Sequence, residues 1–167
     1  DQKTQFHTLM QAVLAQPLLV LSEDSFTRLR QEVALWSRAL IFDATQPADR
    51  DPQELLHTLQ ATMIGEGLFS FYPLSQSLTA TVEVLQMGAA LQTIRPTLYS
   101  EFKPLMEKLV STTAQLVYPN GVFPAAFSET PIEPRLIAEL LERGGKVTGN
   151  PLCKRILTQI YKNQPRL

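Results

Sequence analysis

The stretch from residue 51 to residue 85 constrains the fold of this 167-residue chain more than any other. It begins with Asp51-Pro52-Gln53-Glu54, which supplies a helix cap, a proline at the first helical position and a glutamate at the third. Leucines follow at helical spacing, and glycines stand at positions 65 and 67 before Pro73. The stretch therefore predicts a helical hairpin, with one helix continuing to about residue 66 and a second running from residue 73 to about residue 92.

Apolar residues recur with helical periodicity elsewhere in the chain, and no long alternating strand pattern accompanies them. Further helices are expected over residues 4–15, 23–44, 98–116 and 132–143, and a last one should start at Asn150-Pro151. Thr97 is a candidate cap, and Pro104 predicts a kink or a late start. Gly144-Gly145 should end the helix of residues 132–143.

These helices predict an all-α fold, because loops of about 2 to 8 residues join antiparallel neighbours in helical bundles. We expect an antiparallel four-helix bundle with an extra N-terminal helix and a C-terminal helical pair. The corresponding division is residues 1–22 for the first helix and linker, 23–118 for the bundle, and 119–167 for a loop and helical pair packed on it.

Charge and cysteine content exclude several classes of function. Fifteen Lys and Arg residues are scattered among sixteen Asp and Glu residues, which disfavours nucleic acid as a partner. No apolar run approaches the roughly 20 residues that span a bilayer. Cys153 is the single cysteine, so an internal disulfide is impossible and a reducing cytoplasm fits. The chain begins without Met, as expected of a piece of a longer protein.

His57 is the candidate functional residue of the central stretch. Residues of a helix advance by about 100°, which places His57 nearly opposite a stripe that is expected to be buried and that consists of Leu55, Leu56, Leu59 and Met63. Gln60 and Ala61, three and four residues onward, lie beside it. An exposed imidazole near neutral pKa can act as a nucleophile toward a phosphoryl group. The plain alternative is a surface histidine without a function.

The segment of residues 23–117 resembles a histidine phosphotransfer (HPt) domain. That family has a histidine, a lysine three positions later, a glycine at the fourth and another at the tenth, followed by regular leucines. The matching positions here are His57, Gln60, Ala61, Gly67, Leu68, Phe71, Leu74 and Leu78. Gln60 keeps a hydrogen-bond donor but lacks the charge of the lysine, and Ala61 adds one methyl group to the glycine.

The resemblance implies a phosphorelay domain of two-component signalling, more a phosphocarrier than an enzyme. His57 would be the phosphoacceptor, with Gln60, Ala61, Ile64 and Gly67 supporting the docking of a receiver domain or histidine kinase module. The partner receiver would supply the Mg²⁺, and the chain itself would need no cofactor or metal. Because phosphoryl transfer depends on charge stabilisation, His57 would be a slow phosphoacceptor, or the domain a pseudo-HPt that docks without transfer.

Two other functions remain open. A non-catalytic helical adaptor would bind its partner through residues 119–167. A small-molecule enzyme ranks third, because no set of acid, base and nucleophile emerges from the sequence. His7 and His57 lack metal-like spacing with acidic residues, and Gly144-Gly145-Lys146 lacks the order of a phosphate-binding loop.

Overall fold

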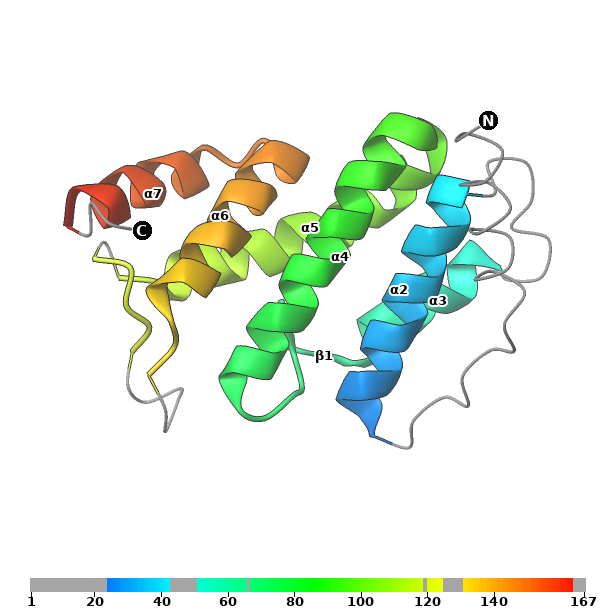
Figure 1. Ribbon diagram of the computed structural model, residues 1–167, viewed down its shortest axis with the longest axis horizontal. Coiled ribbons are helices and arrows are strands. Elements are labelled where there is room, and N and C mark those ends of the chain that lie inside the picture. Colours follow the sequence, from blue (N-terminus) through cyan, green and yellow to red (C-terminus); the bar gives the residue numbers. More distant parts are fainter. Residues whose placement is uncertain (1–23, 43–50, 66, 119, 125–130, 164–167) are drawn as a thin grey trace, which may run out of the picture.

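The computed structural model describes residues 24–42, 51–65, 67–118, 120–124 and 131–163 of the chain. The helices in this part are α2 (Ser25–Phe42), α3 (Pro52–Ala61), α4 (Leu74–Ile94), α5 (Pro96–Leu116), α6 (Pro134–Thr148) and α7 (Pro151–Asn163). Two short strands, β1 (Met63–Ile64) and β2 (Leu68–Phe69), pair in antiparallel fashion. The predicted all-α class is confirmed (Figure 1). The helix expected over residues 4–15 lies outside the described residues.

Helix α4 is the centre of the molecule (Figure 1). It is apolar on most of its circumference and carries a single charged residue, Glu83. Such a helix is stable only when it is buried on several sides. It packs against α2 on one flank and against α5 and α6 on the others. Glu83 forms an ion pair with Arg30 of α2, with 2.6 Å between Oε1 of Glu83 and Nη2 of Arg30.

The contacts of α3 show how the helices around α4 are arranged. Helix α3 packs against α2 and α5, while α2 and α5 each pack against α4. Neighbours therefore follow the order α2, α3, α5, α4 around the group. The short hairpin of β1 and β2 connects the consecutive helices α3 and α4. The main packing partners of α3 are α2 and α5, not α4.

Helix α3 ends at Ala61, five residues before the predicted end at residue 66, so that prediction is wrong. The Thr62 hydroxyl donates to the carbonyl of Thr58 at 2.9 Å and closes the last turn. Gly65 and Gly67 then adopt positive φ angles of 57° and 148°, a region that favours glycine. They turn the chain into a hairpin in which Ser70 N–H donates to the Thr62 carbonyl at 2.8 Å.

Helix α6 continues to Thr148, past the two glycines that were expected to end it. Gly149, with a φ of 74°, is the left-handed C-cap instead. A β-carbon at Gly144 would lie 2.8 Å from Cγ2 of Val110. Gly144 is therefore a close contact between α5 and α6, and the prediction of a helix stop there is wrong.

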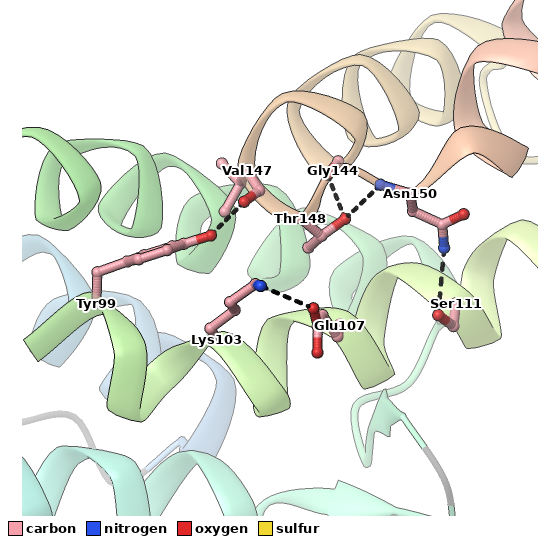
Figure 2. Close-up of polar contacts among 8 residues, drawn as sticks. All are labelled: Tyr99, Lys103, Glu107, Ser111, Gly144, Val147, Thr148 and Asn150. Atoms are coloured by element: carbon pink, nitrogen blue, oxygen red, sulfur yellow. Dashed lines mark hydrogen bonds and ion pairs between the residues drawn. The ribbon is translucent and has the colours of Figure 1, made fainter. Parts of the chain in front are cut away.

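Polar contacts fasten α6 and α7 to α5 (Figure 2). The Tyr99 hydroxyl donates to the carbonyl of Val147. The amide of Asn150 donates to Ser111 Oγ at 3.2 Å, and its Oδ1 accepts from Leu152 N–H at 3.0 Å, which caps α7. The helix begins at Pro151, in agreement with the start predicted at Asn150-Pro151. Buried side chains of α6 and α7 join those of the preceding helices in one core.

The start of α5 also differs from the prediction. Arg95 is the N-cap and Pro96 the first helical residue, so Thr97 lies inside the first turn. Pro104 is exposed and lies within the helix. The late start is therefore not observed, since α5 already has two turns before Pro104.

Candidate functional site

Helix α3 is set in place by its cap and by two leucines. The side chain of Asp51 accepts a hydrogen bond from Gln53 N–H at 2.9 Å, and Pro52 occupies the first helical position. Leu55 and Leu59 are 1% and 0% exposed. With these side chains fixed in the core, the opposite face of α3 must face solvent.

His57 lies on that outer face and is exposed, as the periodicity predicts. No hydrogen bond or ion pair links its imidazole to another side chain in the part of the chain that the structure describes. A ring that is neither buried nor held by a neighbour can accept a group on nitrogen without first breaking an internal contact.

An open depression of about 650 Å³ lies between α2 and α3, next to His57. Its lining residues are Arg28 and Glu32 from α2, and Asp51, Gln53, Glu54, Leu56, His57, Thr58 and Gln60 from the α3 segment. The depression is shallow and polar. It suits a protruding side chain or a group carried by a partner better than an enclosed small molecule.

The charges in this depression are mixed. Arg28 Nε lies 3.7 Å from Glu32 Oε1, one turn further along α2. Asp51 serves as the helix cap, and Glu54 lies in the first turn of α3, where a negative charge is favourable. Gln53 is turned toward α5 and donates to Glu101 Oε2 at 2.6 Å.

The residues predicted to accompany His57 divide into two groups. Gln60 lines the same depression as His57, and Ala61 is exposed at the end of α3. Ile64 is 57% exposed on β1, beyond the end of the helix. Gly67 is instead buried, with its Cα so close to α5 that an added β-carbon would lie 2.5 Å from the Lys108 carbonyl oxygen. Its contribution is to let the hairpin pack against α5.

Arg28 also lines the depression, and no sequence pattern marks it. No spacing along the chain connects positions 28 and 57, because the two residues meet only through the packing of α2 against α3. Only an assumed antiparallel pairing of α2 and α3 would have indicated, weakly, that Arg28 lies near His57. The start of α2 is itself well marked, since Asp24 Oδ2 accepts from Thr27 N–H at 2.8 Å. Hydrogen bonds from the side chain and from the backbone N–H of Thr27 lower the pKa of the Asp24 carboxyl.

Other kinds of site are not supported by the described residues. No cluster of three or more histidine, cysteine, aspartate or glutamate residues in the described ranges could hold a metal ion. Cys153 is buried, and burial raises the pKa of its thiol to about 11. A thiol with this pKa is a poor nucleophile at neutral pH.

Comparison of the chain with protein-family models, with curated proteins and with solved structures gave no match. Among the described helices, none combines the length and the apolar character that crossing a membrane requires. The geometry around His57 is therefore the basis for assigning a function.

Proposed function

We propose that this protein is a cytoplasmic phosphorelay domain similar to HPt domains, which docks a receiver or kinase module on the outer face of α3 and carries a phosphoryl group on His57. The proposal includes the HPt-like bundle of the helices that surround α4. The observation that carries it is the exposed, unpaired imidazole of His57 beside an open depression. The buried Leu55 and Leu59 hold that face toward solvent.

The chemistry asked of His57 is modest. An imidazole nitrogen attacks the phosphorus of an aspartyl phosphate on the receiver, the phosphorus–oxygen bond breaks, and the aspartate leaves as a carboxylate. A new phosphorus–nitrogen bond holds the phosphoryl group. The receiver brings the Mg²⁺ and the donor, so the tasks of α3 are to present the nitrogen and to leave room for the receiver.

Docking on α3 can be separated from the reactivity of His57. Ala61→Arg adds a long charged side chain at the exposed end of α3 and should block a receiver sterically while leaving the imidazole intact. We expect phosphoryl uptake from phosphorylated receiver domains to fall strongly in Ala61→Arg and to vanish in His57→Gln. Uptake that is unchanged in both variants would refute the proposal.

The second candidate is an adaptor that binds its partner through residues 119–167. Exposed apolar side chains in that part favour it, because Val122 and Tyr161 are 45% and 44% exposed. Deleting the segment is not a usable test, since Ile137, Leu140 and Leu141 of α6 are fully buried in the shared core. Surface substitutions are required instead.

Val122→Arg and Tyr161→Arg are the matched probes of the adaptor surface. Under the proposed function, receiver docking survives both substitutions and fails only in Ala61→Arg. The adaptor alternative predicts the opposite pattern, in which partner binding is lost in Val122→Arg or Tyr161→Arg and retained in Ala61→Arg. A pulldown with receiver domains measures this pattern, and receiver binding that fails in Val122→Arg or Tyr161→Arg but survives in Ala61→Arg would refute docking on α3.

A further inference from the structure

At position 60 of α3, next to His57, the depression has no positively charged side chain. Gln60 stands where the resembled family has a lysine, and an amide can donate hydrogen bonds but cannot balance a dianion. A phosphoryl group on His57 needs such a charge, because its stabilisation is mainly electrostatic. Of the described residues that line the depression, only Arg28 is cationic.

Arg28 reaches the depression from the other helix. It lies in the first turn of α2 and, together with Glu32, lines the same depression as His57 and Gln60 of α3. Its side chain is 57% exposed, and its Nε lies 3.7 Å from Glu32 Oε1. This separation is beyond hydrogen-bond length, so the donors of the planar guanidinium remain available to a second acceptor.

We propose that Arg28 supplies, from the neighbouring helix, the positive charge that Gln60 does not, and that Arg28 and Gln60 together hold a phosphoryl group on His57. This inference rests on the proposed function of His57. Arginine suits the task because its guanidinium binds phosphate oxygens in a bidentate manner and stays charged at every physiological pH. The positive charge that a lysine at position 60 would provide therefore comes from Arg28 of the neighbouring helix α2.

Acidic neighbours set the strength of this contact. Glu32 competes for Arg28, while Asp51 and Glu54 also line the depression and repel a dianion. Asp51 is engaged by Gln53 N–H. A phosphoryl group carries about twice the charge of a carboxylate and so competes favourably with Glu32 for the guanidinium. Removing the Glu32 charge should strengthen the contact, and removing the Arg28 charge should abolish it.

Phosphoramidate is the probe, since it phosphorylates histidine without a partner protein. Its phosphorus–nitrogen bond breaks, a bond from phosphorus to an imidazole nitrogen of His57 forms, and ammonia leaves while the other ring nitrogen gives its proton to solvent. The rate of phosphorylation of the full chain is followed by ³¹P NMR and intact mass. Circular dichroism confirms that each variant remains folded.

The two charge variants should change the rate in opposite directions. Arg28→Gln should lower it about tenfold, the effect of one charge-assisted hydrogen bond, and Glu32→Gln should raise it about threefold through the released guanidinium. Arg28→Lys should retain most of the wild-type rate because it keeps the charge. Arg155→Gln, an exposed position on α7, removes the same charge elsewhere and should have no effect.

The outcomes separate the two proposals. If the wild-type chain is phosphorylated on His57 and Arg28→Gln matches Arg155→Gln, the assignment of Arg28 is overturned while the proposed function stands. If Glu32→Gln slows the reaction, the competition between Glu32 and the phosphoryl group is refuted. If His57 takes up no phosphoryl group in any variant, both the function and the role of Arg28 are overturned.

Discussion

Gly67→Ala is the substitution that best tests the packing of the hairpin beside the candidate site. Gly67 has a φ of 148°, which side chains of L-residues rarely tolerate. The new β-carbon would lie 2.5 Å from the carbonyl oxygen of Lys108 and 2.7 Å from Thr112 Oγ1. The first of these atoms belongs to the backbone of α5 and cannot rotate away.

The cost follows from these two effects. Strain at a disfavoured φ contributes about 1–3 kcal/mol, and overpacking against a rigid neighbour contributes about 1–3 kcal/mol. Their sum for Gly67→Ala is therefore about 4 kcal/mol of unfolding free energy. For a chain of this size that corresponds to a fall in melting temperature of about 10 °C.

Gly65→Ala is the matched control in the same hairpin. Gly65 also has a positive φ, 57°, but a β-carbon there would meet no heavy atom within 4 Å. We expect it to cost only about 1 kcal/mol, the penalty of a left-handed conformation. Urea unfolding followed by far-UV circular dichroism measures both variants, and equal losses in the two would refute the claim that Gly67 is required for contact with α5.

Three further substitutions test other parts of the account. Ser77→Ala should cost about 1–3 kcal/mol in urea unfolding, because the Ser77 hydroxyl accepts from the buried N–H of Phe69 at 3.0 Å. Burial raises the pKa of the Cys153 thiol from 9.0 to about 11. The stability that this thiol contributes is therefore present below pH 9.0 and should be lost as the pH rises through about 11. Cys153→Ala should remove this pH dependence of the unfolding free energy. Gly144→Ala should cost about 1–3 kcal/mol by overpacking against Val110, and the double variant with Val110→Ala should be more stable than the sum of the single effects predicts.

The starts of α3 and α7 could be predicted from the sequence because they depend on local chemistry. The side chains of Asp51 and Asn150 each accept a hydrogen bond from the backbone N–H two residues onward, and a short segment contains all the information for such a cap. Leucine spacing likewise determines which face of α3 is buried. The exposure of His57 follows from these two local features alone.

The helix ends were harder to predict because glycine has more than one use. Gly65 and Gly67 mark a hairpin, whereas Gly144 and Gly145 continue a helix that must approach its neighbours closely. The side chain of Val110 decides the second case, and it lies more than thirty residues away in sequence. Sequence alone does not distinguish a glycine that ends a helix from one that admits a neighbour.

The full set of residues around His57 could not be predicted from the sequence either, because it also depends on contacts between distant segments. His57 and Gln60 share one helix and could be paired by their spacing, but Arg28 joins them only through the packing of α2 on α3. For Gly67, in contrast, the sequence suggested a place in the docking surface that the packing does not give it. It was expected to support docking from its place in a motif, and it is buried against the backbone of α5.

Phosphorylation of His57 by a receiver is the most direct test of the proposed function. The full chain is incubated with phosphorylated receiver domains and Mg²⁺, and the product is examined by ³¹P NMR and by its lability in acid. We expect an acid-labile phosphohistidine signal in the wild-type chain and none in His57→Gln. A wild-type chain that stays unphosphorylated, or a His57→Gln variant that gains the same signal, would contradict it.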